Sequence, residues 1–193
     1  MWVRRAAIRP VPSFAELPQR ALLAIEDQLS DDGDDARDRL DQACSRFEQT
    51  QPALAQRVEV ALNSELDETA VALGYFLTLA IWLAFDSAFS GSLDEVSETA
   101  LTGVEESLQL DEQIRLSDPA EAVDSDDVVA MEQPHALAFV HEHLDAALEA
   151  NASVVNVDHV HAIYRVVLIE VLALSYAVLP PANVHVSTTE FSA

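Results

Sequence analysis

The sixteen residues 70–85 (AVALGYFLTLAIWLAF) carry no charge, and this run limits the possible folds more than any other feature of the chain. Apolar residues occupy every side of a helical wheel, so a helix here is either the enclosed helix of a globular domain or a membrane span. Sixteen helical residues cover about 24 Å, less than the ~30 Å hydrocarbon core of a bilayer. No arginine or lysine flanks the run. We therefore predict a buried central helix over about residues 68–90 and no membrane span.

The composition favours helices packed in a single domain. Of the 193 residues, 50% are hydrophobic and only four are glycine, while alanine, leucine, glutamate and arginine dominate the periodic segments. A chain of this length suits one domain with a well-buried core. Residues 158–178 form a second apolar segment, which Pro180 and Pro181 stop. We predict an all-α, single-domain bundle of about seven to nine helices around these two segments.

Residues with special roles at helix starts mark several element boundaries. Asp67 is the predicted N-cap of the central helix. Pro52 and Pro134 stand where two further helices should begin. Ser92 and Glu95 have the spacing of a capping box, which predicts a helix start at Ser92.

The two ends of the chain differ from the domain between them. Residues 1–12 contain three arginines and two prolines, and we predict an extended basic arm that lies across the protein's own acidic surface. Residues 13–179 are the predicted helical domain, and residues 180–193 a flexible tail. No apolar run of signal-peptide length follows the first arginines, so we expect a cytoplasmic protein.

The charge of the chain is strongly negative, with 34 acids, 10 bases and a formal net charge of −24. Such a surface repels nucleic-acid phosphates and anionic membranes and attracts cationic partners. Thirteen of the acids lie between residues 92 and 132, with Arg115 as the one base. The predicted partner-binding acids are Asp94, Glu95, Glu98, Glu105, Glu106, Asp111, Glu112, Glu121, Asp124, Asp126 and Asp127.

A group of histidines and carboxylates is a second candidate site, for a metal ion, with weaker support than the acids between residues 92 and 132. Five of the six histidines lie in residues 135–161. Glu132-x-x-His135 has the spacing of a di-iron bundle unit, although Pro134 interrupts it. A metal site needs three or four converging ligands. The sequence shows histidines and carboxylates only two at a time, so metal binding is kept as an alternative hypothesis. The candidate ligands of a divalent transition metal are Glu132, His135, His141, Asp158 and His161.

Three further charges stand out because they lie in or beside apolar helices. A buried ionised group is costly unless it is paired. Arg165 and Glu170 are five residues apart, which is poor spacing for a pair on one helix. We therefore predict a buried polar network of Asp86, Arg165 and Glu170, in which Arg165 pairs with Asp86.

Motifs for nucleophilic catalysis or phosphate binding are absent from the sequence. The single cysteine, Cys44, excludes an internal disulfide and falls on an apolar stripe. No Gly-x-Ser-x-Gly elbow or phosphate-binding glycine loop occurs. The resulting hypothesis is a non-enzymatic acidic binding protein without a cofactor.

Such a protein would cover a basic surface on a partner as an inhibitor, immunity protein or adaptor, and mimicry of nucleic acid is one form of this hypothesis. Homo-oligomerisation stays open, and no direct contact with nucleic acid or membrane is expected. One alternative is a metal-dependent helical-bundle enzyme or metal-binding protein that uses residues 132–161. The other is that the acidity reflects only adaptation to salt or solubility.

Overall fold

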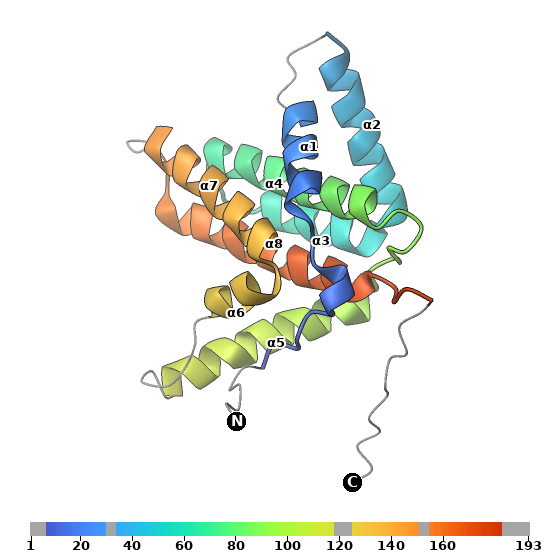
Figure 1. Cartoon of the computed structure of the whole chain (residues 1–193). Coiled ribbons are helices and arrows are strands. Elements are labelled where there is room, and N and C mark those ends of the chain that lie inside the picture. Colours follow the sequence, from blue (N-terminus) through green and yellow to red (C-terminus); the bar gives the residue numbers. More distant parts are fainter. Residues whose placement is uncertain (1–6, 30–33, 118–124, 151–154, 183–193) are drawn as a thin grey trace.

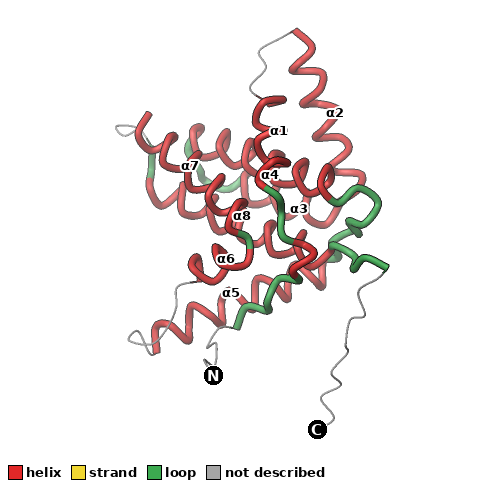
Figure 2. The backbone as a smooth tube through the Cα atoms, in the orientation of Figure 1, coloured by secondary structure: helices red, strands yellow, loops and turns green. Residues whose placement is uncertain are grey.

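The computed structural model describes residues 7–29, 34–117, 125–150 and 155–182. Over these ranges the chain is an all-α bundle, which confirms the predicted fold class (Figures 1 and 2). A 3₁₀ turn at Ser13–Ala15 precedes eight α-helices. They are α1 (Gln19–Leu29), α2 (Asp34–Thr50), α3 (Pro52–Leu62), α4 (Glu68–Ala88), α5 (Glu98–Ser117), α6 (Ser125–Glu132), α7 (Pro134–Ala150) and α8 (Val157–Ala177).

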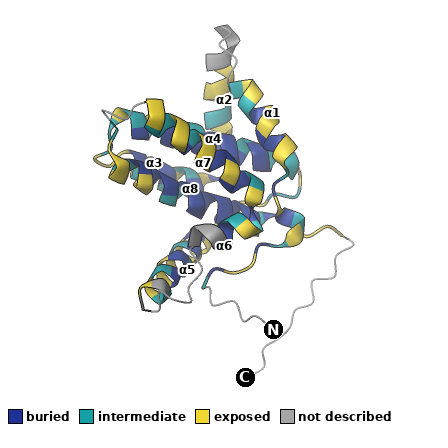
Figure 3. Cartoon of the chain, turned by 60° about the vertical axis from the view of Figure 1, so that its left-hand side comes forward, coloured by how far each residue is buried: buried dark blue, intermediate teal, exposed yellow. Residues whose placement is uncertain are grey.

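Helices α4 and α8, which correspond to the two predicted apolar segments, pack side by side at the centre. They run parallel. At one end Asp67, which caps α4, accepts a hydrogen bond from Asn156 N, just before α8. At the other end Leu93 and Val178, which follow the two helices, form an antiparallel β-bridge. Most residues of both helices are buried (Figure 3).

Small side chains allow α4 to approach its neighbours closely. Ala70, Gly74 and Thr78 follow one another at four-residue intervals and are all buried. A Cβ added at Gly74 would overlap Leu62 Cδ2 on α3 and lie 2.9 Å from Ile163 Cδ1 on α8. The absence of a side chain at this position therefore sets the close packing of three helices.

Helices α4 and α8 are each long and apolar enough, by length and composition, to cross a membrane. More than half of the apolar window in each helix, 56% and 67%, is buried inside the protein. Core helices of globular domains meet the same criteria. The packing of α4 against α8 and the outer helices accounts for their apolar character here.

The outer helices cover this central pair from several sides (Figure 1). Helix α1 packs on α4 and α7, while α2 and α3 pack on each other and on α4. Helix α5 packs on α8 and contacts α6. Exposed residues lie on the outward faces of α1, α2, α5 and α7 (Figure 3).

The predicted helix start at Ser92 is wrong, because α5 begins six residues later at Glu98. The Oγ atom of Ser97 accepts a hydrogen bond of 3.2 Å from Ala100 N, as an N-cap side chain does. Residues 92–97 lie outside the helix. Tertiary hydrogen bonds explain why this segment does not adopt the helix that its capping box predicted.

Buried Gln51 holds the segment before α5 away from the helical conformation. Its side chain accepts a hydrogen bond of 2.8 Å from Val96 N and donates one of 3.0 Å to the backbone oxygen of Asp94. The backbone of the same segment pairs with the chain after α8: Asp94 N donates to Ala177 O, and Leu179 N donates to Ser92 O. These bonds replace the ones that an earlier helix start would have made.

The N-terminal segment 7–17 passes beside α5 (Figure 1). Carboxylates of α5 and α6 bind its backbone. Ala7 N donates to Asp111 Oδ1, and Val11 N donates to Glu132 Oε2, each at 3.0 Å. Carboxylates are strong acceptors for backbone N–H groups that have no partner in secondary structure. Two acids thereby serve as structural anchors for the start of the chain.

Gln133 fixes the end of this segment from the junction of α6 and α7. Its Oε1 atom accepts a hydrogen bond of 2.8 Å from Leu17 N. Its Nε2 atom donates to Ala15 O at 2.7 Å and to Ser175 Oγ at 2.8 Å. Gln133 is fully buried, and these bonds join the N-terminal segment, the α6–α7 junction and α8.

Candidate functional site

The acidic segment 94–112 presents carboxylates outward from α5 and the residues before it. Helix α5 buries a stripe at 101, 104, 108 and 111, so the opposite face meets solvent. Within the described chain, no arginine pairs with the four acids that are exposed here. These four acids, called the acidic surface below, are Asp94, Glu95, Glu98 and Glu106.

Two other predicted partner-binding acids of α5 are held in ion pairs within the protein. Glu105 Oε1 lies 3.0 Å from Arg57 Nη1 on α3. Glu112 is paired with Arg165 on α8. Both pairs are partly exposed, and such pairs contribute about 0–1 kcal/mol to stability.

The assignment of Asp111 to a partner-binding face is wrong. Its side chain is 1% exposed and accepts the hydrogen bond from Ala7 N. Asp111 is three residues after Leu108 and seven after Val104, so helical spacing places it on the buried stripe. Glu121 and Asp124 lie outside the described residues, as do the side chains of Asp126 and Asp127.

Exposed acids also occur on helices that do not belong to the acidic segment. They lie on both α2 and α7, away from α5 in the sequence. Any function assigned to the acidic surface must therefore be separated experimentally from the effect of total charge. Suitable residues for that separation are Asp38, Glu142, Asp145 and Glu149, all of them exposed.

The predicted pair between Arg165 and Asp86 is wrong. Asp86 Oδ2 accepts a hydrogen bond of 2.6 Å from Arg46 Nη2 on α2, while Arg165 pairs with Glu112. The side chains of Arg46 and Asp86 are 53% and 37% exposed, so this pair is not part of a buried network. The Arg46 guanidinium also lies 5.0 Å from the centre of the Trp82 ring.

Glu170 is the one member of the predicted network that is buried, with 0% of its surface exposed. Neither of its carboxyl oxygens has a hydrogen-bond partner among the described residues, and the same holds for Thr78 Oγ1 and Trp82 Nε1. Burial raises the pKa of Glu170 well above its ordinary value, and the Thr78 hydroxyl, which is close to the carboxyl without forming a hydrogen bond of normal geometry, offsets part of this shift. Glu170 is therefore a neutral carboxylic acid over a wider pH range than a solvated glutamate.

The sequence pattern identified Glu170 but not Thr78 and Trp82, the other buried residues whose side-chain polar atoms have no partner in the described chain. Thr78 belongs to the ridge of small residues on α4, where a hydroxyl is easily mistaken for a packing group. Trp82 lies four residues further along the same helix face. The spacing of Thr78 and Trp82 was a usable signal, because both side chains carry a polar atom into an otherwise apolar run.

The predicted metal ligands have other partners or lie apart. Glu132 accepts a hydrogen bond from Val11 N, and His141 Nε2 lies 2.9 Å from Tyr164 Oη. Across residues 7–29, 34–117, 125–150 and 155–182, no three His, Cys, Asp or Glu side chains are placed to hold one metal ion. His135, Asp158 and His161 are therefore not assembled with Glu132 and His141 into a site.

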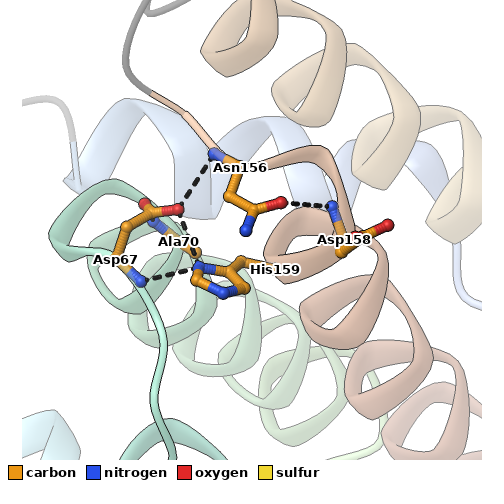
Figure 4. Close-up of polar contacts among 5 residues, drawn as sticks. All are labelled: Asp67, Ala70, Asn156, Asp158 and His159. Carbon is orange, nitrogen blue, oxygen red and sulfur yellow. Dashed lines mark hydrogen bonds and ion pairs between the residues drawn. The ribbon is translucent and has the colours of Figure 1, made fainter.

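A polar cluster that the sequence did not reveal joins the first turns of α4 and α8 (Figure 4). Asp67 Oδ1 accepts a hydrogen bond of 2.8 Å from Ala70 N, and Asp67 Oδ2 accepts one of 3.1 Å from Asn156 N. These hydrogen bonds lower the pKa of the Asp67 carboxyl. The carboxylate thus lies between two parallel helix N-termini, where the positive ends of both helix dipoles favour a negative charge.

His159 completes this cluster from the first turn of α8. Its Nδ1 atom lies 2.9 Å from Asp67 N and 3.0 Å from Asp67 Oδ2. A ring without a proton on Nδ1 accepts from the backbone N–H, whereas a ring protonated at Nδ1 donates to the carboxylate. Asp67 was predicted only as the cap of α4, because nothing in the sequence shows that α8 begins beside it.

The chain matches no family model, and no curated protein or solved structure is significantly similar to it.

Proposed function

We propose that this protein is a non-enzymatic acidic binding protein that covers a basic surface on a partner protein, as an inhibitor, immunity protein or adaptor does. The observation that supports this function is the acidic surface of Asp94, Glu95, Glu98 and Glu106, which is exposed and has no arginine partner in the described chain. With a net charge of −24, the protein attracts cationic surfaces over several ångströms.

Charge complementarity of this kind mainly accelerates association and selects the partner. Binding should therefore weaken as salt shortens the Debye length from about 10 Å at 0.1 M to about 3 Å at 1 M. A partner held mainly by apolar contacts would show no such weakening. Salt dependence is accordingly the property to measure.

The test compares capture of binding proteins by the immobilised wild-type protein and by two variants that each lose four negative charges. In the surface variant, the neutralising substitutions are Asp94→Asn, Glu95→Gln, Glu98→Gln and Glu106→Gln. The matched control variant neutralises the same number of exposed acids on α2 and α7. Its substitutions are Asp38→Asn, Glu142→Gln, Asp145→Asn and Glu149→Gln.

We expect the wild-type protein and the control variant to retain the same basic partner at about 0.1 M salt and to release it at about 1 M. The surface variant should not retain it. Equal capture by both variants would show that capture depends on the total negative charge and not on the acidic surface, as expected for salt adaptation. Failure to capture a basic protein at either salt concentration would also contradict the proposal.

A further inference from the structure

A cavity of about 590 Å³ lies among helices α1 to α4. Its volume falls within the range of about 300–1,000 Å³ that is typical of small-molecule sites. Cys44, Ala55 and Phe76 form partly buried walls, and the floor is buried. The floor residues are Phe47, Val58, Thr78 and Leu79.

The floor contains one polar side chain, the hydroxyl of Thr78. Thr78 is 3% exposed, and its Oγ1 atom has no hydrogen-bond partner in the described chain. Burial raises the pKa of Glu170, the neighbour of Thr78 on α8, well above its ordinary value. None of the floor residues carries a charged side chain, which suits the apolar part of a ligand.

The rim of the cavity has the opposite character. Glu48, Glu59 and Tyr75 line the cavity and are exposed. The nearest arginines on the same helices are held elsewhere: Arg46 pairs with Asp86, and Arg57 with Glu105. The exposed lining also includes Leu40, Pro52, Gln56 and Ala72, so the two carboxylates are the charged groups of the described rim. Two carboxylates and an exposed aromatic ring favour an organic cation.

We propose that this cavity binds a small apolar molecule with a cationic amine or quaternary ammonium head group. The apolar body lies against Phe47, Val58 and Leu79, and the head group lies at the rim beside Glu48, Glu59 and Tyr75. An anionic amphiphile of the same length is disfavoured, because its carboxylate would meet two glutamates on a protein of net charge −24. This site uses none of the acids of the acidic surface.

Isothermal titration with three probes of equal chain length tests the charge preference. The probes are octyltrimethylammonium, octyl glucoside and octanoate, each kept below its micelle concentration. We expect octyltrimethylammonium to bind most tightly and octanoate most weakly. Equal affinities for the three probes, or no binding of octyltrimethylammonium, would overturn the proposal.

Charge-neutralised variants test the role of the rim. Because Glu48 and Glu59 are exposed, replacing both with glutamine should preserve the fold. The double variant Glu48→Gln/Glu59→Gln should bind octyltrimethylammonium about three- to tenfold more weakly, as expected for two exposed ion pairs. The matched control Glu95→Gln/Glu106→Gln removes the same charge from the acidic surface and should leave the affinity unchanged. Equal losses in both variants would overturn the assignment of the head group to this rim.

Cys44 allows the location of the ligand to be tested by chemistry. It is the single cysteine of the chain and lines the cavity wall. Burial raises the pKa of its thiol, and Asp41 and Glu48 raise it further, so labelling requires alkaline pH. The N-ethylmaleimide adduct at Cys44 should abolish binding of octyltrimethylammonium, whereas a Cys44→Ser variant treated in the same way should retain it. Unchanged affinity after complete labelling would place the ligand elsewhere and overturn the proposal.

Discussion

Two buried polar residues, Gln133 and Glu170, have opposite surroundings although each is 0% exposed. The side chain of Gln133 bonds to Leu17 N, Ala15 O and Ser175 Oγ. The carboxyl oxygens of Glu170 have no partner among the described residues. A satisfied buried group stabilises and specifies a fold, whereas an unsatisfied one opposes folding.

Gln133 belongs to a structural junction, whereas Glu170 belongs to a region whose buried polar groups lack hydrogen-bond partners among the described residues. Gln133 holds an irregular N-terminal segment whose backbone groups would otherwise lack partners. Glu170 lies near Thr78, the polar residue of the cavity floor, and both contribute unsatisfied atoms. Buried groups without partners are uncommon in folded proteins and often coincide with functional sites.

Replacing Gln133 should produce the largest change in stability. The substitution Gln133→Leu leaves Leu17 N and Ala15 O buried without partners, and each such group costs about 1–3 kcal/mol. We expect the free energy of unfolding to fall by about 3–5 kcal/mol, measured by urea denaturation. The control Gln109→Leu, at an exposed position of α5, should change it by less than about 0.5 kcal/mol. An equal change in the free energy of unfolding for the two substitutions would show that the hydrogen bonds of Gln133 do not stabilise the fold.

Replacing Glu170 should change stability in the opposite direction. The substitution Glu170→Met removes an unsatisfied buried carboxyl while keeping a side chain of similar length. We expect a gain of about 1–3 kcal/mol in the free energy of unfolding at neutral pH. Glu142→Met, at an exposed position of α7, is the matched control and should have little effect. A loss of stability in the Glu170 variant would show that the carboxyl has a stabilising partner after all.

The pH dependence of that gain follows from the raised pKa of Glu170. Below the unfolded-state pKa of about 4.3, the carboxyl is protonated in both states, so ionisation adds nothing to the difference between wild type and variant. Above it, the unfolded chain releases the proton while the buried carboxyl keeps it, which destabilises the wild type by up to about 1.4 kcal/mol per pH unit. The advantage of Glu170→Met should therefore widen as pH rises from 5 to 9 until the folded-state pKa is passed. A constant difference in urea denaturation across this range would contradict the assignment.

The exposed charges of α2, α4 and α8 should show the smallest effect. In a double-mutant cycle, Arg46→Met and Asp86→Asn should couple by about 0.2–1 kcal/mol, the usual value for exposed ion pairs. The corresponding cycle of Arg165→Met with Asp86→Asn should show additive effects. Coupling in the second cycle and additivity in the first would restore the pair that the sequence suggested.

The sequence predicted the central helices well because their signals are local. The uncharged run at 70–85 enforces burial, and Asp67 caps α4 as its residue type predicts. Pairing of charges could not be predicted in the same way. Asp86 bonds to Arg46 only because α2 packs on α4. The positions of these two residues in the sequence do not predict which helices pack together.

The candidate sites illustrate the same limit. The burial of Asp111 follows from its spacing after Leu108, so the helical periodicity of α5 is sufficient to predict it. The cavity could not be found in this way, because its lining comes from four helices that each show only an ordinary apolar stripe. The separation of charged rim and apolar floor appears only when those helices are assembled.

The binding of residues 7–17 has a consequence for the order in which the protein acquires its structure during synthesis. Ala7 bonds to Asp111, 104 residues later, and Leu17 bonds to Gln133, 116 residues later. At about 5–20 residues per second, a ribosome needs roughly 5–20 s to make the intervening chain. Throughout that interval the apolar side chains of Ile8 and Val11 lack their final surroundings and are open to chaperones. The segment 7–17 is therefore synthesised more than a hundred residues before the partners that complete its native contacts.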